Sequence, residues 1–170
     1  QRGKVLREGI DCAILGKPNA GKSSVLNALC GYDRAIVTPF EGTTRDILEA
    51  YAKLGGVKLR LRDTAGIRDT DDQIEREGVE RAMGAARSAA LKLLVLDGSR
   101  PLDEWDRRVF EVCSGGKTIV LINKSDLKQK LCRDDIPEGL GEIFEVSAKE
   151  GRGFDALAEA TGAMFGAGDL

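Results

Sequence analysis

Histidine is absent from this sequence of 170 residues, and aromatic residues make up only 5% of it. Without histidine the chain lacks the side chain most often used as a general base, so any activation of water must rest on carboxylates, metal ions or the substrate. The usual nitrogen ligand of zinc is missing as well. The four cysteines, Cys12, Cys30, Cys113 and Cys132, contain no C-x-x-C pair. We therefore expect reduced thiols that mostly serve packing.

The sequence also lacks a long apolar run and an excess of charge of one sign. No stretch approaches the ~20 apolar residues that a membrane-spanning helix needs, and residues 1–4 do not resemble the start of a signal peptide. Twenty-six basic and 28 acidic side chains give a formal net charge of -2. Nothing here drives the chain toward nucleic acid or anionic membranes. We expect a cytoplasmic protein with no membrane partner.

The length predicts one domain over residues 1–170, large enough to bury ~70% of the surface that the unfolded chain exposes. Because the sequence begins with Gln1 and not with methionine, we expect this domain to come from a longer multidomain protein.

Apolar runs alternate with segments of helical periodicity, which predicts a mainly parallel sheet of six strands with helices on both faces. Gly55 and Gly56 separate two strand-like segments and predict one antiparallel hairpin. In such sheets ligands bind beyond the carboxyl ends of the strands. The predicted strands are 10–15, 47–54, 57–63, 91–97, 118–123 and 143–146, and the predicted helices are 22–29 (ending at Gly31), 74–86, 103–114 and 154–165.

The clearest motif follows the first predicted strand. Residues 16–23 read G-K-P-N-A-G-K-S, which matches the phosphate loop pattern G-x-x-x-x-G-K-[ST]. Backbone N–H groups of such a loop face phosphate oxygens, while Lys22 supplies a cation and Ser23 a ligand for Mg²⁺. Taken alone, the segment could be a glycine turn with a solvated lysine. The predicted nucleotide-binding residues here are Asn19, Ala20, Gly21, Lys22, Ser23 and Ser24.

Three further motifs follow predicted strands. Residues 63–66 read D-T-A-G, in which Asp63 would reach Mg²⁺ through water and Gly66 would sense the γ-phosphate. Residues 123–126 read N-K-S-D and residues 147–149 read S-A-K. Each could be an ordinary turn at a strand end, but their common order favours a nucleotide site. The predicted nucleotide-binding residues in the last two motifs are Asn123, Lys124, Asp126, Ser147, Ala148 and Lys149.

The N-K-S-D motif favours guanine over adenine. The carboxylate of Asp126 can accept hydrogen bonds from N1 and from the exocyclic amino group of guanine, and adenine offers neither donor. An acceptor left unpaired against the wrong base costs ~1 to 3 kcal/mol for each lost bond. GTP and GDP are therefore the predicted ligands, and the motifs together predict a P-loop NTPase fold of the Ras-like G domain type.

Two segments concern hydrolysis. Residues 42–46 read G-T-T-R-D, where GTPases keep a loop that closes on the γ-phosphate, and Thr44 is the expected Mg²⁺ ligand. The alternative is a loop whose threonines serve turn geometry alone. In Ras-like GTPases a glutamine follows the D-x-x-G glycine and orients the attacking water, but here that position is Ile67. Catalysis must therefore come from other groups.

Several longer segments point to a narrower family. They read A-I-V-T at 35–38, G-T-T-R-D at 42–46, D-T-A-G-I-R at 63–68 and I-E-R-E-G-V-E-R at 74–81. With the phosphate loop, these segments make the sequence resemble the MnmE (TrmE) family of tRNA-modification GTPases over about residues 9–149. The resemblance implies K⁺-stimulated GTP hydrolysis by G domains that pair as a homodimer through their switch regions.

The resemblance also implies a potassium site in place of an arginine finger. Asn19, Thr38, Phe40 and Thr43 correspond to the family's K⁺ ligands, and Thr38 also counts among the nucleotide-binding residues. A turn residue is the alternative role of Asn19. The bulky run P-F-E at 39–41 departs from the small or aliphatic residues common in that loop.

Glu75 corresponds to the catalytic glutamate of the family, which orients the attacking water, and Gly42 and Thr43 are grouped with it as catalytic residues. Residues 72–75 read D-Q-I-E, which also resembles a helix capping box. In that alternative the carboxylate of Glu75 accepts a hydrogen bond from a backbone N–H and plays no part in the reaction.

The function implied by the resemblance is GTP hydrolysis that drives conformational change during modification of the tRNA wobble uridine, with the flavoprotein MnmG as partner of the full-length protein. tRNA would be contacted indirectly, because the folate-binding, helical and cysteine-containing parts of the family are absent from these residues. The alternatives are a nucleotide-dependent binding switch and a ribosome-assembly GTPase of the related bacterial families.

Overall fold

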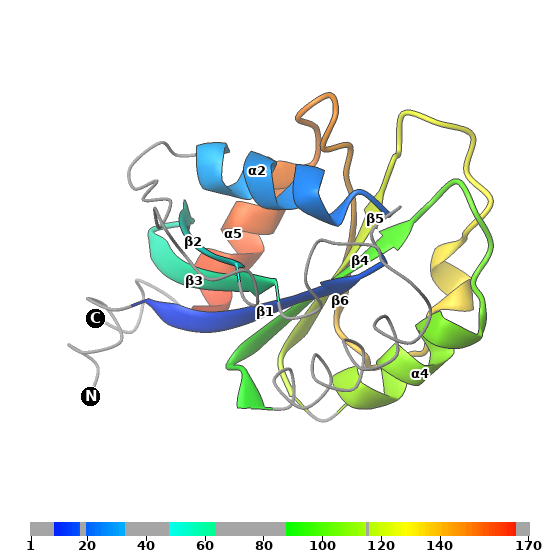
Figure 1. The fold of residues 1–170 in the computed structure, drawn as a ribbon, viewed down its shortest axis with the longest axis horizontal. Coiled ribbons are helices and arrows are strands. Elements are labelled where there is room, and N and C mark those ends of the chain that lie inside the picture. Colours follow the sequence, from blue (N-terminus) through cyan, green and yellow to red (C-terminus); the bar gives the residue numbers. More distant parts are fainter. Residues whose placement is uncertain (1–8, 18–19, 33–47, 64–87, 115, 166–170) are drawn as a thin grey trace.

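The computed structural model describes residues 9–17, 20–32, 48–63, 88–114 and 116–165. Strands and helices alternate along these ranges, as the apolar periodicity predicts (Figure 1). The elements are β1 (Ile10–Gly16), α2 (Lys22–Tyr32), β2 (Leu48–Leu54), β3 (Val57–Asp63), β4 (Leu91–Asp97), α4 (Glu104–Cys113), β5 (Thr118–Asn123), η2 (Arg133–Asp135), β6 (Glu142–Glu145) and α5 (Phe154–Phe165).

The six strands form one sheet in the order β2-β3-β1-β4-β5-β6. β2 and β3 pair antiparallel at one edge, and every other neighbouring pair is parallel. The turn at Gly55 and Gly56, which both have positive φ, joins the antiparallel pair. The predicted fold class, a P-loop type sheet with one antiparallel hairpin edge, is confirmed.

Helices cover both faces of the sheet. α2 and α5 lie on one face and α4 lies on the other (Figure 1). Because the central strands are covered on both sides, every residue of β5 is buried, and so are the first six of β4. β3, near the edge, instead alternates, with Leu59 and Leu61 buried and Arg60 and Arg62 on the opposite face.

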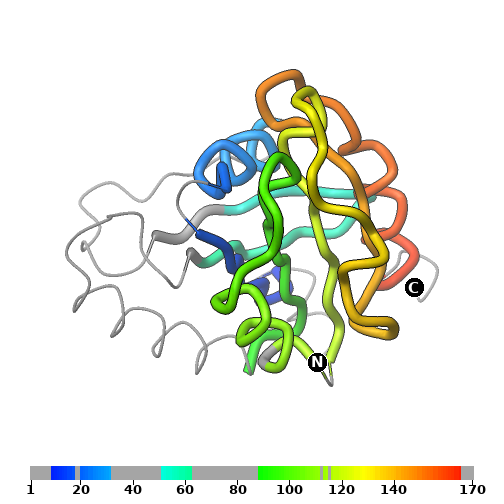
Figure 2. The backbone as a smooth tube through the Cα atoms, turned by 90° about the vertical axis from the view of Figure 1, so that its right-hand side faces the viewer, coloured from blue at the N-terminus to red at the C-terminus, as the bar shows by residue number. Residues whose placement is uncertain are grey.

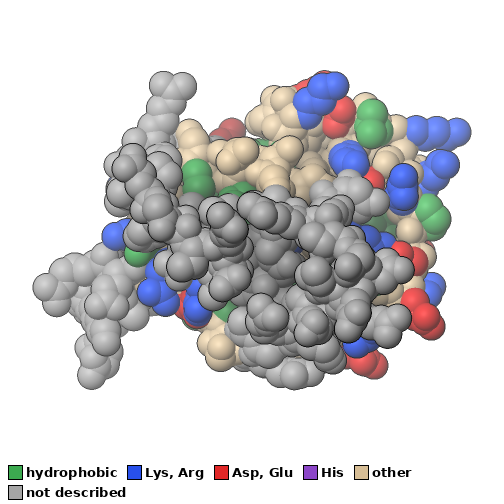
Figure 3. Space-filling view, viewed as in Figure 1, with side chains coloured by type: hydrophobic (Ala, Val, Ile, Leu, Met, Phe, Trp, Pro, Cys, Tyr) green, Lys and Arg blue, Asp and Glu red, His purple; other side chains and the backbone are tan. Residues whose placement is uncertain are grey.

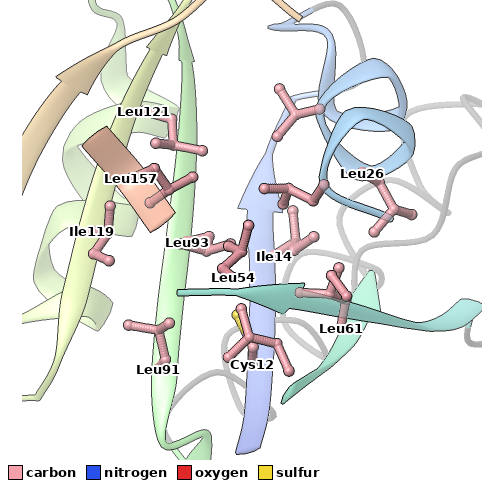
Figure 4. Packing of buried hydrophobic residues seen from close by; sticks show 14 of the residues in the cluster. Cys12, Ile14, Leu26, Leu54, Leu61, Leu91, Leu93, Ile119, Leu121 and Leu157 are labelled. Atoms are coloured by element: carbon pink, nitrogen blue, oxygen red, sulfur yellow. The ribbon is translucent and has the colours of Figure 1, made fainter. Parts of the chain in front are cut away.

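Two apolar clusters hold the layers together. In the larger one Leu26 of α2 and Leu157 of α5 pack toward Ile14, Leu61 and Leu93 on the strands (Figure 4). Fully burying one such leucine contributes ~1.5 to 3 kcal/mol. The second cluster joins α4 to the other face of the sheet. The carboxyl ends of the parallel strands are thereby held in fixed relative positions.

Several predicted boundaries differ from the structure by one to three residues, among them the end of α2 and both ends of β6. α2 continues through Gly31 to Tyr32, because a glycine within a helix costs only ~1 kcal/mol relative to alanine and does not by itself end it. β6 spans Glu142–Glu145 and not 143–146, although the N–H of Val146 still donates to the carbonyl oxygen of Ile122 at 2.8 Å. The predicted helix 74–86 lies outside the described residues.

The cysteines are free thiols, as expected, and two of them are packing residues. Cys12 and Cys113 are fully buried, and burial raises the pKa of the Cys113 thiol to about 11 and that of Cys12 further. Neither is a thiolate at neutral pH, so neither is a nucleophile. Cys132 is the exception, because it is exposed. Among the described helices, none is long and apolar enough to cross a membrane.

Candidate functional site

The phosphate loop connects β1 to α2 at the carboxyl end of the sheet. β1 ends at Gly16 and α2 begins at Lys22, so the motif occupies the strand-to-helix connection that the sequence predicts. Lys22 is 1% exposed, whereas Ser23 and Ser24 in the first turn of α2 are exposed. The N-terminus of this helix therefore presents backbone N–H groups and serine hydroxyls, which suit an anionic phosphate and its Mg²⁺.

Gly21 explains why this loop needs glycine. Its φ is +87°, in the left-handed region, and a Cβ at this position would lie 2.4 Å from Nδ2 of Asn123. Any other side chain would strain the backbone and also displace the asparagine. The N-K-S-D motif thus packs directly against the phosphate loop.

Asn123 connects three of the predicted motifs. Its side chain is buried, with 3% exposed. Nδ2 donates to the carbonyl oxygen of Ala20 at 2.9 Å, and Oδ1 accepts from the N–H of Ala148 at 3.0 Å. One amide therefore joins the phosphate loop, the N-K-S-D motif and the S-A-K motif. Figure 2 shows the loops that follow β5 and β6 side by side, near the start of α2.

Asp126, the residue predicted to recognise guanine, is held by the S-A-K motif. The hydroxyl of Ser147 donates to Oδ1 of Asp126 at 2.9 Å, and Ser147 is itself fully buried. This hydrogen bond lowers the pKa of the Asp126 carboxyl below its ordinary value. The carboxylate is therefore charged at neutral pH and is available as an acceptor.

Lys124 takes an unusual backbone conformation. Its φ of +66° is the only positive value of a residue other than glycine in the described ranges. Nζ lies 3.1 Å from Oδ2 of Asp97, at the end of β4. Burial opposes ionisation of Asp97, but hydrogen bonds donated by Ser99 and Lys124 outweigh it and lower the pKa of this carboxyl. Lys149, the other predicted lysine of the base-binding loops, is exposed.

The sheet register places the D-T-A-G motif beside the phosphate loop. In the parallel pair of β1 and β3, Asp63 lies opposite Ile14, two residues before Gly16. Asp63 is the last residue of β3, so the backbone of the motif begins at the edge where the phosphate loop begins. The side chain of Asp63 lies outside the described part of the structure.

Several predicted site residues cannot be located, because they fall outside the described residues. These are Asn19 of the phosphate loop, Thr38, Phe40, Gly42, Thr43 and Thr44 of the following segment, Gly66 of the D-T-A-G motif, and Glu75.

Sequence reasoning missed two ion pairs beside the site. Lys17 of the phosphate loop pairs with Asp103, at the start of α4, and Lys124 pairs with Asp97. Asp97 could have been found, since it ends a predicted strand on the ligand-binding edge of the sheet. Residues 103–106 read D-E-W-D, a capping pattern, but no sequence signal places them against residue 17.

The cavities and charged side chains of the described residues say little about the site beyond what the motif positions indicate. A cavity of about 630 Å³ lies between α4 and residues 135–140, away from every predicted motif, and one of about 230 Å³ adjoins Lys17 and Ala20. Within the described ranges no three His, Cys, Asp or Glu side chains form a metal cluster. On the face in Figure 3, positive and negative side chains are interspersed. This fits the absence of a basic bias in the sequence.

A family model described as 50S ribosome-binding GTPase matches residues 11–124. The tRNA modification GTPase MnmE of Streptococcus sanguinis (strain SK36) is 47% identical over 97% of this chain, and the MnmE of Streptococcus agalactiae serotype III (strain NEM316) is 48% identical over the same share. In each case the chain spans 35% of the relative's length.

Solved structures of similar fold are also GTPase domains. The G domain of the T. maritima FeoB iron transporter is 24% identical with a TM-score of 0.61, covering 92% of this chain and 98% of that one. Era in complex with MgGDPNP and a segment of 16S ribosomal RNA is 26% identical with a TM-score of 0.63, covering 92% of this chain and 55% of that one.

Proposed function

This chain belongs to the GTPase family that matches residues 11–124, and from this premise we propose that it couples K⁺-stimulated GTP hydrolysis to conformational change in tRNA modification. The predicted enzyme class, a GTPase, is confirmed by that family and by the MnmE relatives. The predicted resemblance to the MnmE G domain is confirmed too. Like G domains generally, the chain binds guanine nucleotide, and Mg²⁺ accompanies GTP.

The observation that carries the nucleotide assignment is the buried amide of Asn123. By bonding to Ala20 and Ala148 it holds the phosphate-binding and base-binding loops at one place. Asp126, ionised beside Ser147, then faces the two donors that only guanine among the common bases presents together. We infer that residues 1–170 act as one GTP-binding domain.

For Mg²⁺ the available side chains fit. The exposed hydroxyl of Ser23 lies in the first turn of α2, and the register brings Asp63 to the same edge. We propose Ser23, Thr44 and, through water, Asp63 as the protein's contribution, the remaining ligands being phosphate and water oxygens. Held by these residues, Mg²⁺ would supply positive charge beside the phosphates of the nucleotide. A site of this kind needs no cluster of three carboxylates.

For the bond-breaking step we propose that K⁺, held by Asn19, Thr38, Phe40 and Thr43, stabilises negative charge on the phosphates. Turnover by the unaltered chain in KCl is expected to exceed turnover in NaCl of equal ionic strength by about tenfold or more, since one well-placed charge contributes ~1.4 kcal/mol or more. Phosphate release measured at matched salt and saturating GTP tests this. Equal rates in the two salts would contradict the proposal for K⁺ and leave nucleotide binding intact.

Glu75 is proposed to orient the attacking water, and Gly42 and Thr43 are proposed to take part in catalysis with it. Glu75→Ala is expected to reduce turnover by about 100-fold or more, because a positioned acid–base group contributes ~10² to 10⁴ to a rate. Binding of fluorescent GDP should persist. The matched control is Glu80→Ala, five residues further on, which should keep normal turnover. If Glu75→Ala kept normal turnover, the capping alternative would hold.

The whole protein's role extends beyond these residues. The chain spans about a third of its MnmE relatives, so tRNA modification, pairing of two G domains through the switch regions and cooperation with MnmG are proposals for the complete protein. The 47% identity over nearly the whole chain supports them. A cytoplasmic location is part of the same proposal.

A further inference from the structure

Lys17, a phosphate loop residue outside the predicted site, is attached to α4. Its ammonium group forms an ion pair with Asp103 and lies 3.6 Å from Oδ2 of Asp106. The same nitrogen lies 5.8 Å from the ring centroid of Trp105, the chain's single tryptophan. Only 29% of the Lys17 side chain and 9% of the Asp106 side chain are exposed. Three residues at the start of α4 therefore contact this one lysine.

Hydrogen bonds within the N-terminal cap of α4 hold the carboxylates of Asp103 and Asp106 in place, and these bonds do not involve Lys17. Asp103 caps α4, accepting from the N–H of Asp106 at 3.2 Å, while Asp106 accepts from the N–H of Asp103 at 3.0 Å. Burial raises the pKa of Asp106. Burial acts in the same direction on Asp103, but the hydrogen bond from Lys17 and others outweigh it, so the pKa of Asp103 is lowered. The cation thus stabilises a fixed pair of acids.

On its backbone side, Lys17 belongs to the nucleotide site. Its carbonyl oxygen accepts from the N–H of Ala20 at 3.0 Å, closing the first turn of the phosphate loop. The carbonyl oxygen of Ala20 in turn accepts from the amide of Asn123. A continuous series of contacts therefore runs from the α4 cap through Lys17 and Ala20 to the base-binding loops.

We infer that Lys17 is a positioning residue: its ion pairs with Asp103 and Asp106 hold its backbone against Ala20, in the arrangement of the phosphate loop that binds guanine nucleotide. This inference rests on the proposed nucleotide binding, and it adds α4 to the elements that determine the affinity of the chain for guanine nucleotide. A fully exposed ion pair would contribute little. Here the Asp103 side chain is 54% exposed but that of Asp106 only 9%, so losing the cation would leave the carboxylate of Asp106 buried without its charge partner.

The cavity beside the ion pair gives the loop room to move once it is released. About 230 Å³ of space is bounded by Lys17, Ala20, Asp97 and the first turn of α4. Without the ion pair, Lys17 can shift within this space, and its backbone contact with Ala20 is no longer held from the α4 side. Nucleotide binding must then reorder it, which weakens affinity.

The test uses four single variants of the chain, one double variant and fluorescent GDP, with binding read by energy transfer from Trp105. Lys17→Met keeps the length of the side chain without its charge, and its affinity for GDP is expected to fall by about fivefold, the effect of roughly 1 kcal/mol. Lys17→Arg, which retains the charge, should stay within about twofold of the unaltered chain. Lys128→Met, at an exposed lysine, is the matched control and should bind normally.

The α4 side is tested with Asp103→Asn, which can still cap the helix. This variant should lose affinity as Lys17→Met does, and combining the two should add little further loss, since both remove one interaction. Thermal unfolding of each nucleotide-free variant is measured alongside. A role in stability alone would lower the melting temperature and leave the affinity of the folded protein unchanged, and this result would overturn the inference.

Three other outcomes also decide against it. Equal losses in Lys17→Arg and Lys17→Met would show that the ion pair is not what matters. If the unaltered chain bound no GDP, both the inference and the proposed function would fail. If the unaltered chain and Lys17→Met both bound GDP normally, the inference would fail and the proposed function would stand.

Discussion

Lys22→Ala is expected to bind GTP at least about 100-fold more weakly than the unaltered chain and to show no measurable hydrolysis. Lys22 is 1% exposed at the first residue of α2, and the phosphate loop motif predicts that its charge binds the terminal phosphates. A hydrogen bond to a charged group contributes ~1.5 to 3 kcal/mol, so losing two of them accounts for an effect of this size. Affinity for fluorescent GTP and phosphate release measure the two effects.

The fold should survive this substitution. Alanine has the highest helix propensity, so α2 still begins at this position. Circular dichroism should show an unchanged spectrum, and Lys53→Ala, on the edge strand β2, should bind GTP normally. Tight GTP binding by a folded Lys22→Ala chain would mean that residues 16–23 do not hold the phosphates.

Asp126→Asn is expected to lose guanine recognition and to gain xanthine. Asp126 accepts from the hydroxyl of Ser147, and asparagine can still accept there through Oδ1, so the loop keeps its shape. Its Nδ2 donor then faces the amino group of guanine but would pair with the carbonyl that xanthine carries instead. Affinity for GTP should fall by about 100-fold or more, since each unmade bond to a charged acceptor costs ~1.5 to 3 kcal/mol.

Competition of GTP and XTP for the fluorescent nucleotide measures this exchange. Asp134→Asn, at an exposed residue of η2, is the control and should keep the preference for GTP. A variant at Asp126 that still preferred GTP would place guanine recognition elsewhere in the chain. Equal loss of both nucleotides would indicate damage to the loop and no change in recognition.

The sequence was sufficient for the fold class because its signals are local. The runs at β4 and β5 are mostly apolar and end in Asp97 and Asn123, so both the strands and their ligand-binding ends could be predicted. Gly31 misled the prediction of α2, since a glycine can end a helix or lie within one, and only packing of the neighbouring turns decides between them.

The candidate site was predictable at the level of residue types but not of contacts. Lys22, Ser23 and Asp126 follow from motifs in which spacing reflects the chemistry. The contact of Lys17 with Asp103 joins residues that are 86 positions apart, and no sequence motif contains both of them. Their meeting depends on how α4 packs against the sheet.

By itself, then, the sequence determined the motifs and their order along the chain: a phosphate loop, an aspartate predicted to recognise guanine, and the strands that precede them. Only the tertiary structure decided how these groups hold one another. Asn123 bonds Ala20 across 103 positions because parallel pairing brings the ends of β1, β4 and β5 to one edge. Such a register is set by burial of whole strands against helices, a property that no short motif contains.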